Sequence, residues 1–522
     1  MNPYAPVRHR LLALACAASL AVAAVPGSAV AQNQLPALGD TAGDDFGIGT
    51  ERKVGDQIMR EIRRDPDYSD DPVLLEYVQS LFLPLVAAAR QRGEIGADLE
   101  QRFAFEAFLV RDRSVNAFAL PGGYIGVHLG LIGLTATRDE LASVLAHELS
   151  HVTQRHIARS IASSKRQSLI GLAATILGVL AASRSSSMDG ANAILAGGQA
   201  AQIQGQLNFS REMEREADRI GFGVMTGAGF APGGMAAMFE KLAQNSRLND
   251  TSSGFPYLRS HPLTTERIGE ARARLGTAPA VAPVSALEHA AAQARARVLM
   301  DPRTDALRRW QKRDADSGGP TVADKLEAAY ESALASTMLR DWARADTSLA
   351  RAMALVQGSP RSDSRAERAV VLLAVQSLLE RGDAVRAEAA LKPYAGEPSR
   401  PVVLLSGRVA LARQDEAALK RGAEELQSWV GGHPQDAEGW SVLGQVWTRL
   451  NQPLRALRAA AESRLALGDL AGAVDRLRAG QRLARSGGAV DFIEASVIDA
   501  RLRDVETQRR QLMAEDKQGE RP

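Results

Sequence analysis

The feature that most constrains this chain is a pair of histidines four residues apart, His147 and His151, inside an apolar stretch. Residues 141–160 carry apolar side chains at 141, 144, 145, 149 and 152, which is the spacing of one helical face. Both imidazoles can then reach one metal ion, and Glu148 lies beside them as a candidate general base. The pattern predicts a zinc-dependent hydrolase with a catalytic helix at its centre.

A catalytic zinc site takes three protein ligands and keeps a fourth position for water. His156 follows five residues after His151, on another face of the expected helix, so we do not expect it to be the third ligand. A second predicted helix offers several carboxylates instead. Spacing alone does not choose among Glu212, Glu214 and Glu216, and such charge clusters are usually solvated.

Strand-forming segments precede the catalytic helix. Residues 103–110 and 117–131 are rich in aromatic and branched side chains, and Pro121-Gly122-Gly123 predicts a turn within the second segment. The sequence therefore predicts a mainly α fold with a small antiparallel β-sheet packed on helices.

The C-terminal half predicts helical repeats. From about residue 325 to 506 the chain is rich in Ala, Leu and Arg, with short breaks that resemble the turns of tetratricopeptide repeats. Four breaks look alike: Arg340-Asp341-Trp342-Ala343-Arg344-Ala345, Gly382-Asp383-Ala384-Val385-Arg386-Ala387, Asn451-Gln452-Pro453-Leu454-Arg455-Ala456 and Gly468-Asp469-Leu470-Ala471-Gly472-Ala473. Stacked helix pairs leave a concave surface that usually binds polypeptide, whereas a plain helical bundle would have no such role.

The N-terminus reads as a secretory signal peptide. Basic residues at 8–10 precede an apolar stretch at 11–25 and the small-residue site Ala29-Val30-Ala31, so we expect residues 1–31 to be removed. Cys16 is the one cysteine and lies in this segment, so the mature chain would have no disulfide. We expect no later segment to span a membrane, because the best candidate, 169–182, is shorter than about 20 residues.

Composition completes the expected organisation. The chain has 63 Lys and Arg against 61 Asp and Glu, so its net charge does not indicate a nucleic-acid partner. Residues 278–283 read Ala-Pro-Ala-Val-Ala-Pro, which favours an extended connection. We expect a metalloprotease domain over residues 32–277, a linker over 278–285 and a repeat domain over 286–522 that ends in a polar tail.

Four separated motifs lie between residues 49 and 274. They are Asn116-Ala117-Phe118-Ala119-Leu120-Pro121-Gly122-Gly123, His147-Glu148-x-x-His151, Glu214-x-x-Ala217-Asp218, and Ser260-His261-Pro262 with Arg267. Together they resemble the HtpX-like and CAAX-prenyl-protease-like family of gluzincin metallopeptidases. The resemblance implies one Zn²⁺ per chain, held by His147, His151 and Glu214, with Glu148 as general base.

The same resemblance implies further roles. Asp218 would orient a histidine ligand through its other ring nitrogen. The strand that contains Asn116, Ala117, Phe118 and Ala119 would lie at the cleft edge and pair with an extended substrate, although a hairpin serving only the core is the plain alternative. His261 would either stabilise the transition state or occupy the open zinc position and keep the enzyme latent. A structural His-Pro turn is the remaining alternative.

The signal peptide and repeats make the periplasmic BepA-like branch the nearest match. This resemblance implies a zinc metalloendopeptidase that acts on misfolded or stalled envelope proteins and assists outer-membrane protein assembly. Its repeats would contact the assembly machinery, with no nucleic acid and no transmembrane segment in the mature chain. The alternative function is a zinc-containing chaperone or assembly adaptor that seldom cleaves. Without a cysteine in the mature chain, no disulfide can lock protease to repeats.

Overall fold

The computed structural model describes residues 47–163, 210–248, 256–275, 287–316, 319–359, 363–486 and 491–519. The expected signal peptide with Cys16, the 169–182 segment and the 278–285 linker lie outside the described residues. Within the described residues the fold is mainly helical with one small sheet, which confirms the predicted fold class.

The sheet has four strands in the order β1-β2-β4-β3. They are β1 (Tyr68–Ser69), β2 (Glu106–Val110), β3 (Ala117–Leu120) and β4 (Tyr124–His128). β3 and β4 form an antiparallel hairpin, but β2 runs parallel to β4, so the prediction of an antiparallel sheet was wrong. The reason is the hairpin itself, since it inserts β4 between β2 and β3. Its turn holds Gly122 and Gly123 at φ of 79° and 91°, where a side chain would be strained.

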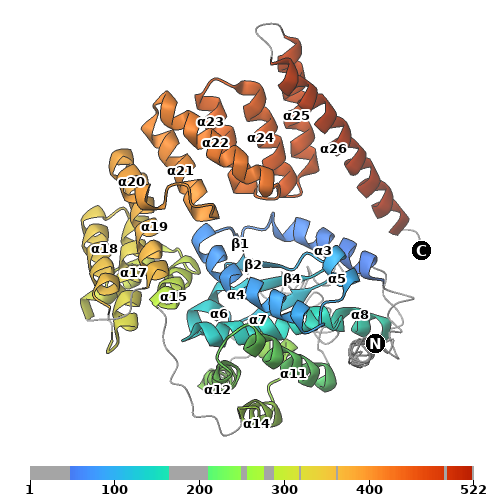
Figure 1. Ribbon diagram of the computed structural model, residues 1–522, viewed down its shortest axis with the longest axis vertical. Coiled ribbons are helices and arrows are strands. Elements are labelled where there is room, and N and C mark those ends of the chain that lie inside the picture. The colour runs from blue at the N-terminus through green and yellow to red at the C-terminus, as the bar shows by residue number, and fades with distance from the viewer. Residues whose placement is uncertain are drawn as a thin grey trace, which may run out of the picture. The chain divides into compact units, whose positions relative to one another are not determined.

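The described part of the protease region also contains ten helices. They are α3 (Ile48–Ile62), α4 (Pro72–Gln91), α5 (Ala97–Arg102), α6 (Leu129–Leu134), α7 (Arg138–Thr153), α8 (His156–Ser163), α11 (Arg211–Gly227), α12 (Gly233–Leu248), α13 (Pro256–Ser260) and α14 (Thr265–Ala273). Figure 1 shows α12 and α14 beyond α7 and α11 rather than against the sheet. The main core lies between the sheet and α4, α7, α11 and α12. α7 is therefore a central helix, with every residue from Glu140 to Thr153 buried.

One helix of the protein core is long and apolar enough to meet the criteria for a membrane span. Among the described residues, α4 is long and apolar enough to cross a bilayer by length and composition alone, and the sequence analysis missed it. Nine of its side chains, among them Leu81, Phe82 and Leu85, are buried within the protein core.

The helix predicted over residues 141–160 is broken. α7 begins at Arg138 after the N-cap Thr137, whose side chain accepts a hydrogen bond from the N–H of Glu140, and it ends at Thr153. Arg155 then takes φ of 52°, and α8 starts at His156 with a new axis. This break changes where His156 lies relative to His151.

The C-terminal region consists of α-helices joined by short turns (Figure 1). They are α15 (Leu287–Leu299), α16 (Thr304–Gln311), α17 (Val322–Met338), α18 (Trp342–Gln357), α19 (Ser364–Glu380), α20 (Ala384–Leu391), α21 (Arg400–Arg413), α22 (Glu416–Gly432), α23 (Ala437–Arg449), α24 (Pro453–Ala466), α25 (Leu470–Arg485) and α26 (Phe492–Gly519), with 3-10 turns η2 (Arg313–Asp316) and η3 (Lys392–Tyr394). From α17 onward, each helix packs against the next one in the chain.

The similar breaks noted in the sequence have one backbone cause. In each, a residue with positive φ ends one helix, as at Arg340, Gly382, Asn451 and Gly468. In three of them the next residue is an aspartate that caps the following helix by accepting a main-chain hydrogen bond. Gln414 and Asp415 form the same turn, which the sequence comparison missed because glutamine rarely adopts this conformation.

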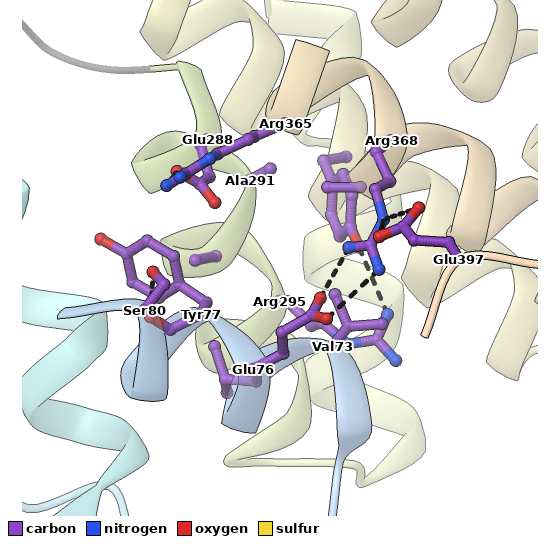
Figure 2. Close-up of a pocket in the computed structure, with 14 residues that line it drawn as sticks. Val73, Glu76, Tyr77, Ser80, Glu288, Ala291, Arg295, Arg365, Arg368 and Glu397 are labelled. Atoms are coloured by element: carbon purple, nitrogen blue, oxygen red, sulfur yellow. Dashed lines mark hydrogen bonds and ion pairs between the residues drawn. The ribbon is translucent and has the colours of Figure 1, made fainter. Parts of the chain in front are cut away.

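Helix α15 joins the two regions. Its Ala292 and Ala296 belong to the protease core, whereas Ala291, Ala294 and Val298 belong to the first repeat core. A cavity of about 260 Å³ lies between α4, α15 and α19. Figure 2 shows Arg368 between Glu76 and Glu397, which it pairs at 2.6 and 3.0 Å.

Candidate metal centre

Four buried side chains meet on one face of α7. His147 and His151 come from α7, Glu214 from the first turns of α11, and His261 from the residue after α13. Each is at most 2% exposed, and one ligand atom from each lies within 4.8 Å of the others. No other such cluster of potential ligands occurs within the described ranges.

The separations inside this cluster fit a zinc ion. The Nε2 atoms of His147 and His151 are 3.0 Å apart, and each lies 3.5 Å from a carboxylate oxygen of Glu214. The Nδ1 atom of His261 lies 3.3 Å from His147 Nε2 and 2.9 Å from Glu214 Oε1. Ligand bonds of 2.0–2.1 Å in a tetrahedron put ligand atoms about 3.3 Å apart, so the printed separations bracket the required geometry.

Close packing of α11 on α7 selects among the three glutamates. A Cβ atom on Gly221 would lie 3.1 Å from the Ala146 backbone, so only glycine allows this approach without adjustment. Glu214 then reaches the histidines, while the Glu212 side chain is 77% exposed. Glu216 faces a different neighbour, His156.

Asp218, one turn after Glu214, lies behind His147. Its Oδ1 atom is 3.0 Å from His147 Nδ1, on the side of the ring opposite the cluster. Arg267 donates two hydrogen bonds to this carboxylate and also lies 2.8 Å from Glu214 Oε2. Three buried charges therefore fix the position of one histidine ring.

His156 lies behind the other histidine. Its Nδ1 atom is 2.9 Å from His151 Nδ1, and its Nε2 atom is 3.1 Å from Glu216 Oε2. His156 is not in the ligand cluster, as expected, but its ring contacts a ligand ring, which the sequence analysis did not anticipate. The contact between His156 and His151 depends on the helix break at Arg155, which residue spacing does not reveal.

Glu148 is fully buried beside the cluster, with Oε1 at 3.5 Å from His261 Nε2. Burial raises the pKa of its carboxyl above the ordinary value, although His261, His147 and the main-chain N–H of Ala119 act in the opposite direction. A raised pKa suits a carboxylate that accepts a proton and then releases it.

The cluster has the electrostatics of a cation site. Burial lowers the pKa of His151 well below its ordinary value and favours the neutral ring that a metal requires. Burial opposes the charged form of Glu214, but His261 and His147 hold its pKa below the usual range. Burial also opposes the charged form of His147, but hydrogen bonds to Asp218 and Glu214 prevail and raise its pKa to about 10. These buried carboxylates supply negative charge that a divalent cation can neutralise.

The segment expected to bind substrate is the edge strand β3. The His128 N–H donates to the Asn116 carbonyl, so by register Phe118 and Leu120 also bond to β4. The main-chain groups of Ala117 and Ala119 therefore face away from β4. Strand β3 packs against α7, which carries Glu148, so this edge adjoins the cluster.

The comparison with known proteins decides the family. The profile described as Peptidase family M48 matches residues 76–275, which contain all four cluster residues. A beta-barrel assembly-enhancing protease of Yersinia pestis is 30% identical over 481 residues, covering 90% of this chain and 91% of its own length. The chain belongs to peptidase family M48. This confirms the recognised resemblance and, with the cluster, makes the chain a zinc metalloendopeptidase.

Two further M48 relatives show how far the similarity extends. The beta-barrel assembly-enhancing protease of Escherichia coli (strain K12) is 28% identical over 95% of this chain and 96% of its own length. The mitochondrial metalloendopeptidase OMA1 of Saccharomyces cerevisiae is 31% identical over 37% of this chain and 53% of its own length. Similarity to the first relative therefore includes the repeats of this M48 chain.

Three residues at the site had no predicted role. Arg267 was part of a recognised motif, but nothing in its spacing revealed the contact with Asp218. His156 was weighed only as a ligand. Tyr257, buried in α13, stacks on His261 with ring centroids 4.7 Å apart, and lone aromatic residues are ordinary core members in sequence.

Proposed function

We propose that this chain is a periplasmic M48 endopeptidase that hydrolyses misfolded or stalled envelope proteins during outer-membrane protein assembly. The names of the relatives, which are proteases that enhance β-barrel assembly, support this role. The signal-peptide pattern at residues 1–31 supports export. The observation that carries the proposal is the buried cluster of four ligand atoms with Glu148 beside it.

In this proposal His147, His151 and Glu214 hold one zinc ion. Zinc, when bound, supplies Lewis-acid polarisation of the scissile carbonyl and lowers the pKa of water. Glu148 accepts a proton from the attacking water and later gives it to the leaving amine. Asp218 holds His147 with its Nδ1–H directed away from the cluster, so that Nε2 is free to bind.

Substrate binds as an extended strand against β3. The outward main-chain groups of Ala117 and Ala119 would accept it by edge pairing, within the segment that runs from Asn116 through Phe118. Edge pairing uses hydrogen bonds to main-chain groups, which all substrates share. This suits an enzyme that must accept many unfolded sequences. Because β3 packs against α7, a substrate strand on this edge would pass beside Glu148, the proposed base.

His261 keeps the resting enzyme latent. Its Nδ1 atom lies among the ligand atoms, 2.9 Å from Glu214 Oε1, and can serve as a fourth ligand. An entering substrate would displace it. The displaced imidazole would remain near the reacting carbonyl and stabilise the developing oxyanion, so one residue serves both predicted roles.

The repeats would present substrates and contact the assembly machinery. We retain the division into a protease domain over residues 32–277, a linker over 278–285 and repeats over 286–522. A groove of about 850 Å³ on α23, α24 and α25 is lined by Arg464 and Arg476 and by no acidic side chain. This groove is our candidate surface for a partner polypeptide.

The test uses full-length chains in cells that lack their own copy. Truncation at the linker is unsuitable, because α15 contributes Ala292 and Ala296 to the protease core. We expect Glu148→Gln to leave misassembled outer-membrane proteins undegraded, and Arg464→Glu with Arg476→Glu to reduce degradation while casein cleavage by the purified chain persists. Full rescue of every phenotype by Glu148→Gln would instead support the chaperone function.

A further inference from the structure

His151 is held through a second imidazole. Its Nε2 atom belongs to the ligand cluster, and its Nδ1 atom, on the opposite side of the ring, is 2.9 Å from Nδ1 of His156. His156 is fully buried, and its Nε2 atom is 3.1 Å from Glu216 Oε2. Arg159 donates to the same carboxylate oxygen at 2.9 Å.

His151, His156 and Glu216 form a hydrogen-bonded row, and the carboxylate at its end determines which ring nitrogens carry hydrogen. A carboxylate only accepts hydrogen bonds, so His156 donates its Nε2–H to Glu216. In a neutral ring the other nitrogen then accepts, so His151 donates its Nδ1–H to His156. Nε2 of His151 is left with a lone pair directed at the cluster. If His156 instead donated to Nδ1 of a neutral His151, the hydrogen of His151 would lie on Nε2 and prevent that atom from binding a metal.

We propose that His156 and Glu216 are positioning residues that fix the tautomer and ring orientation of His151 for zinc. This inference rests on the proposed zinc site but not on any particular substrate. The carboxylate–imidazole–imidazole row replaces the direct carboxylate contact that His147 makes with Asp218.

The two supports differ in their surroundings. Asp218 is fully buried and bound by Arg267, whereas the Glu216 side chain is 30% exposed and bound by Arg159 of α8. The position of α8 thus sets the orientation of His151. The turn at Arg155, whose Nε donates to Glu51 at 3.1 Å, fixes where α8 begins.

Zinc affinity of the full chain, measured by competition with a chelator, tests the proposal. We expect His156→Leu to weaken zinc binding by about 10- to 100-fold, the usual effect of removing a group that orients a ligand. His156→Asn retains an acceptor for the His151 N–H and should recover most of the loss. The absorption spectrum of the cobalt-substituted chain should change in the leucine variant, because the geometry at the metal changes.

A pair of charge-reversal variants tests the same proposal even if the His156 variants fail to fold. Glu216→Lys removes the acceptor at the end of the row, whereas Glu212→Lys makes the same change four residues earlier on α11 at an exposed side chain. We expect only Glu216→Lys to weaken zinc binding, by about tenfold. Affinities within twofold of wild type for both His156→Leu and Glu216→Lys would overturn the proposal. A chain that binds zinc tightly but cleaves nothing, both as the wild type and as His261→Ala, would refute the protease function and leave this proposal standing.

Discussion

Arg267 binds Asp218 through two parallel hydrogen bonds, from Nε to Oδ2 at 2.7 Å and from Nη2 to Oδ1 at 2.8 Å. The same guanidinium reaches Glu214, so one cation holds both a ligand and the residue that orients another ligand. The pair is buried, with side chains 4% and 0% exposed. Removing one partner of such a pair lowers the free energy of unfolding strongly, because the other charge remains buried without a partner.

Arg267→Gln should therefore destabilise the chain. Breaking a buried ion pair costs about 3–5 kcal/mol, since two carboxylates would remain without their cation. Urea denaturation with and without zinc measures this loss, and zinc should restore part of it by neutralising the same carboxylates. Arg272→Gln is the control, because its pair with Glu240 is exposed and should contribute less than about 1 kcal/mol. Equal losses in the two variants would contradict this interpretation.

His289 should make stability depend on pH at the junction between protease and repeats. Its Nε2–H donates to the Thr135 carbonyl, and its Nδ1 accepts from the Tyr77 hydroxyl. Burial lowers the pKa of His289 to about 4, below the ordinary value of about 6.5. The unfolded chain then binds more protons between these values, so stability present above pH of about 6.5 is lost as the pH falls towards 4.

The pH effect is checked by comparing unfolding at pH 7 and pH 4.5. The wild type should lose about 2 kcal/mol more than His289→Gln over this interval, because most of the proton uptake expected from the pKa shift occurs between these pH values. His433→Gln, at an exposed histidine, should behave as the wild type. If His289→Gln and the wild type lose the same stability, His289 is not the titrating group.

Ala119→Pro tests the edge strand. The substitution removes an outward N–H of this edge without breaking a bond to β4, because Ala119 lies at a position that does not bond to that strand. We expect a higher KM for casein-derived peptides and unchanged zinc content. Ala119→Ser, which keeps the N–H, should cleave as the wild type does. Matching kinetics in both variants would mean that β3 does not bind substrate.

His261→Ala tests latency. Removing the fourth candidate ligand should open the site, so cleavage of unfolded casein should become several-fold faster at low substrate concentration. Zinc should remain bound through the other three residues. If casein cleavage falls instead, His261 acts mainly as a stabiliser of the transition state.

Sequence alone predicted the parts of the metal site that depend on local helix geometry. His147 and His151 share a face in any helix, so their meeting was predictable. Choosing Glu214 over Glu212 and Glu216 required a resemblance, because the choice depends on how α11 packs against α7 at Gly221. The role of His156 depends on a left-handed residue, Arg155, that spacing does not reveal.

The same limit applied to the sheet and the helices. The strands were found from their composition, but the parallel pairing of β2 with β4 depends on contacts between segments distant in sequence. The apolar length of α4 was overlooked, although it is visible in the printed sequence. Its burial against the rest of the core is a tertiary property that composition does not give.

The central claim is that Glu148 performs the chemistry while binding no metal. The most direct measurement is zinc content and casein cleavage, side by side, for the wild type and Glu148→Gln. We expect equal zinc content and cleavage reduced by about 10²- to 10⁴-fold, which is the usual contribution of a general base. Cleavage by Glu148→Gln at the wild-type rate, with zinc bound, would contradict it.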